Sequence, residues 1–131
     1  MEIRIPKNSD KYKWTNHVLA KMQYYGLSES RIIRTIRSPN RVEEGIAPET
    51  IAVMQVVGSK KHLYEVWVMY QEINNGNKTK KILKTNNTKY QYPSSSKTII
   101  SAWRYPGVSP IDKEIPIPDD IRAELEIILQ N

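Results

Sequence analysis

The sequence lacks the features that would tie it to a disulfide-bonded, secreted or membrane-spanning class. It has no cysteine, which excludes a disulfide framework, a thiolate metal site and a cysteine nucleophile. Phenylalanine is also absent, so eight tyrosines and three tryptophans supply all aromatic side chains. The longest apolar run, Val66–Tyr70, is five residues and too short to span a bilayer. Met1–Arg4 resembles neither a secretory signal nor a transit peptide. We therefore expect a cytoplasmic protein that does not enter a membrane.

The common motifs of nucleotide-dependent and metal-dependent enzymes are missing as well. The chain has no phosphate-binding glycine loop, no dinucleotide fingerprint, no zinc-protease helix and no serine nucleophile elbow. It has two histidines, and no carboxylate stands at metal-ligand spacing from His17. We therefore expect neither a cofactor nor a metal.

With 131 residues, the chain is long enough for one domain and hardly for two. Residues 1–105 are predicted to form a single α+β domain, and residues 106–131 a proline-rich arm with a C-terminal helix. A short strand is expected at Glu2–Ile5, before Pro6. The segment Lys11–Tyr25 then has helical spacing of its apolar residues, at Trp14, Val18, Met22 and Tyr25. Ser28 is suited to cap a second helix that must end before Pro39, giving an N-terminal helical hairpin.

Segments rich in Val, Ile, Thr, Tyr and Trp follow and are predicted to be strands at Arg41–Ala47, Thr50–Val57, His62–Ile73, Thr79–Thr85 and Lys97–Tyr105. The expected fold is α+β, with the hairpin packed on one face of a twisted antiparallel sheet in two layers. The segment Pro106–Pro118 reads as an extended arm. A short helix, Ile121–Leu129, ends the chain with aligned aliphatic side chains that need an apolar partner. That partner is a groove on the same domain or a second subunit; a homodimer through this helix is favoured.

The charges are unevenly distributed along a chain with 20 basic and 14 acidic residues. The stretch from residue 112 to residue 126 holds six of the acids and only two of the bases. The rest is therefore strongly basic, and a segregated positive field attracts polyanions, among which nucleic acid is the commonest. The alternative is a soluble protein whose lysines simply face water.

His17 and Lys21 stand one helical turn apart at the border of the first helix's apolar stripe. A histidine beside a cation in such a place fits an acid/base pair. It fits equally a border histidine that hydrogen-bonds to the sheet, with a lysine extending past it to solvent.

Arg31, Arg34 and Arg37 form a stripe along the second predicted helix, which we call the arginine stripe. Guanidinium groups match phosphate oxygens bidentately, and no acid within that helix neutralises the stripe; a solvated helix face is the alternative. Near the end of the last strand, Trp103-Arg104-Tyr105 could stack a base and hold a phosphate, or Trp103 could belong to the core. The predicted nucleic-acid-binding residues are Arg31, Arg34, Arg37, Arg41, Lys78, Lys80, Lys81, Lys84, Trp103 and Tyr105.

Several short motifs together resemble a known family. They are His17 followed by Lys21-Met22, the turn Tyr25–Glu29, and Ser38-Pro39. They resemble a small bacterial family of unknown function, similar in layout to the BrnT and RelE type toxins, which are metal-independent ribonucleases. That family shows a His with a basic residue and Met one turn on, an Arg-Gly-Ile-Ser turn, and Asn-Pro after the second helix.

The resemblance covers Trp14–Tyr105, with Ser101–Tyr105 in the place of the family's closing strand. Lys21 and Tyr25 stand where that family has arginines, so a cleavage role of the second arginine would be missing here.

Two functions from different classes follow. The first is a toxin-type endoribonuclease, with His17 as acid or base and Lys21 and Arg104 as catalytic cations stabilising the phosphorane-like charge, together with Arg34. The second is a non-catalytic module that uses the same basic surface to bind RNA or an acidic, antitoxin-like protein.

Overall fold

The computed structural model describes residues 4–46, 49–74 and 95–129 and contains three helices and five strands in this part of the chain. The helices are α1 (Asn16–Tyr25), α2 (Glu29–Arg37) and α3 (Asp119–Leu129). The strands are β1 (Tyr12–Trp14), β2 (Arg41–Glu44), β3 (Thr50–Ser59), β4 (His62–Asn74) and β5 (Ser95–Pro106). No helix in these ranges is long and apolar enough to cross a membrane.

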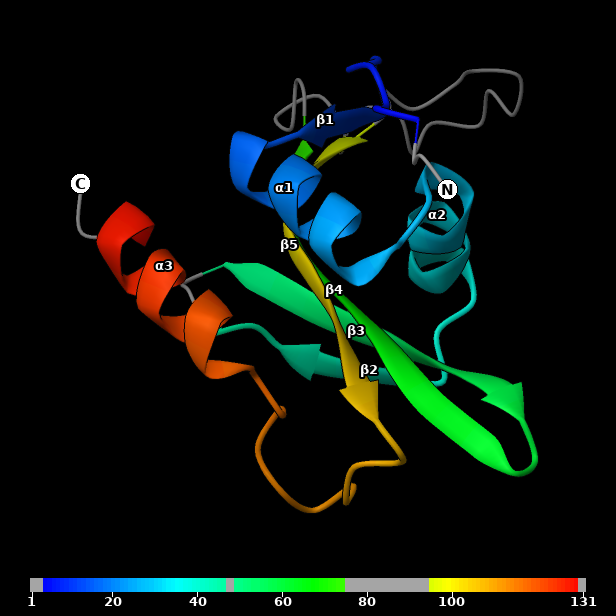
Figure 1. Cartoon of the computed structure of the whole chain (residues 1–131). Coiled ribbons are helices and arrows are strands. Elements are labelled where there is room, and N and C mark those ends of the chain that lie inside the picture. The colour runs from blue at the N-terminus through cyan, green and yellow to red at the C-terminus, as the bar shows by residue number, and fades with distance from the viewer. Residues whose placement is uncertain (1–3, 47–48, 75–94, 130–131) are drawn as a thin grey trace, which may run out of the picture.

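The strands form one sheet in the order β1-β5-β4-β3-β2, with β4 at the centre (Figure 1). β3 and β4 run antiparallel up to the tight turn between Ser59 and His62. β2 pairs with β3 and β5 with β4 in the same antiparallel sense, whereas β1 runs parallel to β5. The predicted strand Thr79–Thr85 lies outside the described residues.

The fold class predicted from the sequence is wrong in two respects: a strand and not a helical hairpin comes first, and the sheet is mixed, not antiparallel. Trp14 caused the error, because its spacing from Val18 mimics a helical stripe. Its burial instead comes from β1, where Trp14 lies beside Ile99 of β5. Thr15 is the N-cap of α1, and its hydroxyl accepts a hydrogen bond from the Val18 N–H. Residues 4–9 form no strand, so the predicted Glu2–Ile5 strand is not present in the described part.

The sheet is covered on both faces, so the domain has three layers where two were expected. Side chains alternate along β4: Val66, Val68 and Tyr70 pack with α1 and α2, whereas Trp67 and Met69 face the opposite way. The second face is covered by α3, whose Ile121 and Leu125 are fully buried there with Trp103.

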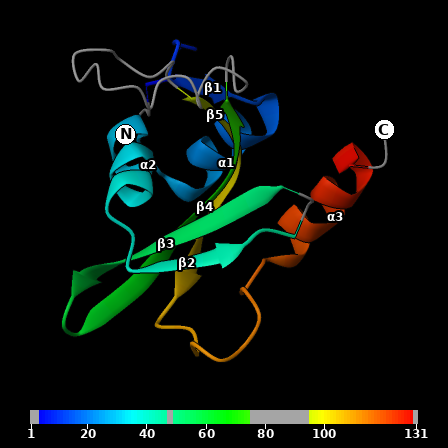
Figure 2. The ribbon, with the colours of Figure 1, turned by 180° about the vertical axis from the view of Figure 1, so that it is seen from behind.

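The connection from β5 to α3, residues 107–118, leaves the end of β5 and turns back to α3 (Figures 1 and 2), and we call it the strap. Its Ile115 and Ile117 pack on the second face of the sheet. A buried polar network holds the strap. The fully buried Glu65 carboxylate accepts hydrogen bonds from the Ser109 N–H (2.8 Å), the Ser109 hydroxyl (2.7 Å) and the Trp67 indole (2.8 Å). The Trp103 indole donates to the Pro116 carbonyl at 2.9 Å. Every one of these bonds satisfies a group that would be costly to bury alone.

The buried side chains of α3 therefore pack against their own chain. Of the two partners expected for this helix, a groove on the same domain is the one observed for these side chains. Ile121 and Leu125 contribute that packing. A homodimer through this helix would have to use its remaining faces, and it stays a prediction.

Candidate functional site

The two sequence-predicted catalytic residues of α1, His17 and Lys21, lie together and face two carboxylates of α3. The Lys21 ammonium is 2.7 Å from Asp120 Oδ2 and 3.1 Å from Glu124 Oε1. His17 Nδ1 is 3.2 Å from the same Glu124 oxygen, and His17 Nε2 is 2.9 Å from the Ser101 hydroxyl. We call these five residues the α1–α3 cluster. It joins α1 to β5 and α3, which both lie more than eighty residues further along the sequence.

A β-bulge in β5 places Ser101 in this cluster. The register skips Ile100, since Met69 pairs with Ser101 and Tyr70 pairs with Ile99. The extra residue reverses the alternation beyond it, so Ser101 lies on the same face of the sheet as Trp103 and α3.

The hydrogen bonds set the tautomer of the neutral His17 ring. A carboxylate can only accept, so Nδ1 carries the proton toward Glu124, and Nε2 accepts from the Ser101 hydroxyl. Burial lowers the pKa of His17; Lys21 pushes it down further, and Glu124 opposes both. The neutral ring is therefore the resting form at pH 7.

The Lys21 ammonium is held in its charged form. Burial alone would lower the pKa of Lys21, but hydrogen bonds to Asp120 and Glu124 outweigh burial and raise it. The same contact lowers the pKa of Asp120 against the effect of its own partial burial. The Tyr25 hydroxyl lies 3.4 Å from Asp120, and burial followed by this carboxylate raises the pKa of Tyr25 to about 12. The cluster is thus an ion-pair network of one ammonium and two carboxylates beside a neutral histidine, and it keeps one net negative charge.

The chain Ser101–His17–Glu124 has the connectivity of a nucleophile, a base and an orienting acid. Access decides against that use in the observed arrangement. Ser101 is fully buried, and the His17 side chain is 8% exposed with a partner on each ring nitrogen. Substrate cannot reach the serine while α3 is docked. The hydrogen bonds serve instead to join α1, β5 and α3.

Arg104, the third predicted catalytic residue, lies at the far end of α1. Its Nε donates to the Tyr25 carbonyl at 2.8 Å and its Nη2 to the Gly26 carbonyl at 3.3 Å. Its guanidinium lies 4.6 Å from the centre of the Tyr64 ring. The helical rise from residue 17 to residue 25 is about 12 Å, so Arg104 does not share a site with His17. Arg104 satisfies carbonyls at the helix C-terminus, where a cation is favoured.

The predicted aromatic platform beside Arg104 is part of the protein interior. Trp103 is fully buried and stacks on Trp67, with ring centroids 6.0 Å apart and planes 7° apart. Tyr105 is half-buried and packs against the hydrophobic core residues around Trp67 and Trp103. The alternative in which Trp103 is a core residue is the one observed.

Two predicted phosphate-binding arginines are engaged within the fold. Arg41 is buried, lies 5.2 Å from the centre of the Trp67 ring, and holds the strap through the Ser109 hydroxyl and the Lys113 carbonyl, each at 3.0 Å. It is also paired with Glu43 at 2.7 Å. Arg31 is half-buried and donates to the Gln55 side chain at 3.2 Å.

The remaining arginines of the stripe, Arg34 and Arg37, are exposed on the outer face of α2. Neither guanidinium has an ion-pair partner within the described ranges. The predicted lysines Lys78, Lys80, Lys81 and Lys84 lie outside the described residues.

Arg37 also lines a cavity of about 200 Å³ with Lys11, Tyr12, Ile36 and Lys97. We call it the basic pocket. Lys11 directly precedes β1, Arg37 ends α2, and Lys97 lies in β5, where it is paired in register with Tyr12. The parallel β1–β5 pairing therefore assembles the pocket, and a backbone hydrogen bond of 2.8 Å from Lys97 N–H to the Lys11 carbonyl secures it.

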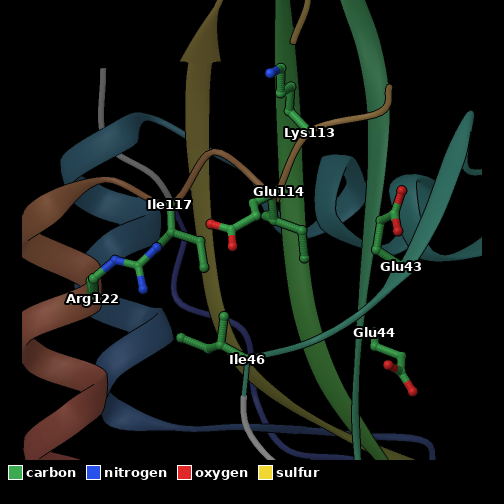
Figure 3. A pocket seen from close by; sticks show the side chains of 8 residues that line it. Glu43, Glu44, Ile46, Lys113, Glu114, Ile117 and Arg122 are labelled. Carbon is green, nitrogen blue, oxygen red and sulfur yellow. The ribbon is translucent and has the colours of Figure 1, made fainter. Parts of the chain in front are cut away.

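A cavity of about 380 Å³ opens between the end of β2 and the strap and has the opposite character (Figure 3). Three carboxylates, Glu43, Glu44 and Glu114, line it against two cations, Lys113 and Arg122. Its apolar side chains are those of Ile46, Ile115 and Ile117. An excess of carboxylates repels phosphate, so this cleft does not extend the basic surface. No three His, Asp or Glu side chains in the described ranges are grouped closely enough to hold a metal ion.

Sequence reasoning missed Ser101, Asp120 and Glu124 as partners of the α1 residues, and Lys11, Tyr12 and Lys97 as a pocket. Asp120 and Glu124 share one helix face at a spacing of four, which was a usable signal. The pocket had none, because it depends on a parallel pairing across more than eighty residues. No family model, no curated protein and no solved structure matches this chain.

Proposed function

We propose that the protein is a cytoplasmic, non-catalytic RNA-binding module whose basic surface is the outer face of α2 together with the adjoining basic pocket. The observation that carries the proposal is the pairing state of the cations. Lys21, Arg104 and Arg41 are occupied by partners within the fold, whereas Arg34 and Arg37 are exposed and have no ion-pair partner among the described residues. Cations of the second kind can exchange their counterions for phosphates.

Charge segregation supports the same surface. The carboxylate-rich cleft lies at the end of β2 and the basic pocket lies beside β1, and these two strands are the opposite edges of the sheet. A polyanion is therefore attracted to one end of the molecule and repelled from the other. Such binding reads phosphates and not base edges, so little sequence preference is expected.

The test is binding of a short single-stranded RNA measured by fluorescence anisotropy at several salt concentrations. The double variant Arg34→Gln/Arg37→Gln is expected to weaken binding and to reduce the slope of log K against log salt by about 1.4, at about 0.7 per phosphate contact. The matched control is Lys60→Gln/Lys61→Gln, which removes the same charge from the exposed β3–β4 turn at the far end of the sheet. Equal losses in the two variants would contradict a localised site.

The toxin-type endoribonuclease is the second candidate, since His17 and Lys21 do lie side by side as the acid/base hypothesis requires. It needs α3 to move away from Ser101 and His17. Incubation of RNA with pure protein in EDTA tests it: defined fragments that disappear in His17→Ala would establish cleavage and reject the non-catalytic assignment.

The relationship to the BrnT and RelE type toxins belongs to this second candidate and stays a proposal. The binding module has an alternative partner, an acidic, antitoxin-like protein that would bind the same basic surface. Such a partner would compete with RNA for Arg34 and Arg37 and would be displaced by the same salt.

A further inference from the structure

The basic pocket differs from the rest of the basic surface because three elements converge on a hollow. Lys11 precedes β1, Arg37 ends α2 and Lys97 belongs to β5, and the three cations line one cavity of about 200 Å³. Among the residues that the structure describes, no acidic side chain is part of the lining. Side chains from separate elements hold fixed positions around a ligand, unlike a row of arginines on one helix.

The charge of the pocket can be estimated from its neighbours. Lys97 Nζ is 3.4 Å from Glu72 Oε2, so one of the three positive charges is balanced. Lys11 and Arg37 have no ion-pair partner in the described part of the chain. The surplus is about two positive charges. A phosphate monoester carries about −1.5 to −2 charges at pH 7, whereas an internal phosphodiester carries one.

The volume and the remaining lining agree with this charge. Drug-sized ligands occupy cavities of about 300–1,000 Å³, so a cavity of about 200 Å³ accommodates a smaller group. Tyr12 and Ile36 give it an aromatic and an aliphatic wall. Tyr12 is half-buried and its ring lies 6.4 Å from that of Trp14, so packing restrains it. A phosphate among the cations, with part of a sugar or base against Tyr12, matches these walls.

We propose that the basic pocket binds a dianionic phosphate monoester, and that in RNA it takes the phosphate at a chain end in preference to an internal phosphodiester. The second part rests on the proposed RNA-binding function, whereas the first does not. Lys11 and Arg37 form the charge-assisted hydrogen bonds, Lys97 adds a partly balanced charge, and Tyr12 contacts the attached nucleoside.

The first experiment tests the pocket without RNA. Adenosine 5′-monophosphate, inorganic phosphate and adenosine are titrated into the full chain, and the amide shifts of Lys11, Tyr12, Arg37 and Lys97 are followed by NMR. We expect saturable shifts with the two phosphates and none with adenosine. Lys11→Gln is expected to weaken phosphate binding about tenfold, and the control Lys13→Gln, an exposed neighbour outside the pocket lining, is expected to leave it unchanged. Shifts that are absent, or that are lost equally in the two variants, would overturn the proposal.

The second experiment separates the pocket from the RNA-binding function. One RNA sequence is compared with a 5′-phosphate, a 3′-phosphate and hydroxyls at both ends. We expect one of the phosphorylated ends to bind about tenfold more tightly than the hydroxyl end, with most of this preference lost in Lys11→Gln. Equal binding of all three RNAs would reject end recognition and leave the RNA-binding module intact. Binding of the mononucleotide without any binding of RNA would support the pocket and reject the proposed function.

Discussion

The cations of the α1–α3 cluster and those of the basic pocket are alike in the sequence and opposite in the fold. Lys21 is one-tenth exposed at its side chain and contacts two carboxylates within 3.3 Å. Arg37 is exposed and has no carboxylate partner among the described residues, although it too stands on a helix next to an isoleucine-rich face. The difference comes from the neighbours of each helix: α3 brings two carboxylates to Lys21 of α1, whereas no acidic side chain is among the described residues that line the pocket beside Arg37.

This difference separates cations that stabilise the fold from cations that are available to a ligand. An ion pair that is shielded from water contributes to stability but cannot release counterions to a polyanion. Exposed, unpaired cations do the reverse, since they contribute little to stability and retain their counterions until a phosphate replaces them. Each of the variants below changes either the cations that are paired within the fold or the cations that are exposed and unpaired.

The largest effect is expected from Leu125→Ala, which undermines the helix that neutralises Lys21. Leu125 is fully buried on the second face of the sheet. Truncating such a side chain leaves a cavity, and we expect a loss of about 2–5 kcal/mol in the free energy of unfolding measured with denaturant. The control on the same helix is Ile127→Ala, at a side chain 65% exposed, with an expected loss below about 1 kcal/mol. Comparable losses would mean that α3 is not anchored through its buried face.

The next effect concerns the charges of α3. In Asp120→Asn/Glu124→Gln, Lys21 stays in its shielded position without an ionic partner, whereas Lys21→Met removes the charge itself. We expect the double variant to lose about 1–3 kcal/mol, reduced from a fully buried pair because the carboxylates are 41% and 47% exposed. Lys21→Met is expected to lose less, because it leaves only exposed acids that water can solvate. Denaturant unfolding measures the free energy of unfolding of both variants. A larger loss in Lys21→Met than in the double variant would reject the ion-pair interpretation.

A smaller effect follows from the protonation of His17. Its folded-state pKa lies below the usual 6.5, mainly because of burial. Above pH 6.5 the ring is neutral in both states; as the pH falls below 6.5, protons bind the unfolded chain first, and stability is lost until the pH passes the folded-state pKa. Melting temperatures between pH 7.5 and pH 5 are expected to fall more steeply for the natural chain than for His17→Gln. His62→Gln is the control, because His62 is exposed in the β3–β4 turn region and its variant should keep the natural slope.

The sequence predicted local structure well where one element decides it. Ser28 caps α2, as expected, with its hydroxyl accepting from the Arg31 N–H. Gly26 ends α1 in the left-handed conformation, with φ of 70°, which favours glycine. The strands around the β3–β4 turn were placed within about two residues, since β-branched content and turn chemistry are local signals. β1 was missed because three residues carry too short a pattern, and its partner is β5.

The candidate site was predictable only in part, for a related reason. Residue type and spacing identify His17 as a titratable group and Lys21 and the arginines as cations, but their pairing depends on contacts such as that of Lys21 with Asp120, across 99 residues. Arg41 illustrates the limit: in the sequence it stands close to the arginines of the second helix, and in the fold it is buried and holds the strap. The bulge that turns Ser101 toward His17 likewise has no local signature in the sequence.

The smallest effect on stability is expected at Arg34 and Arg37. These arginines and Lys21 are compared both in stability and in RNA binding. Arg34→Gln and Arg37→Gln remove exposed guanidiniums without a described ion-pair partner, so each is expected to change the free energy of unfolding by no more than about 0.5 kcal/mol. The residual loss reflects their favourable place in the last turn of α2, where cations oppose the helix dipole. Lys21→Gln serves as the paired measurement, because it loses a charge of the same sign from a shielded position with two acidic partners. We expect it to cost more stability than either arginine variant and to leave the salt dependence of RNA binding unchanged, while the arginine variants do the opposite. A variant that lost stability and RNA affinity together would show that the two groups of cations are not separate.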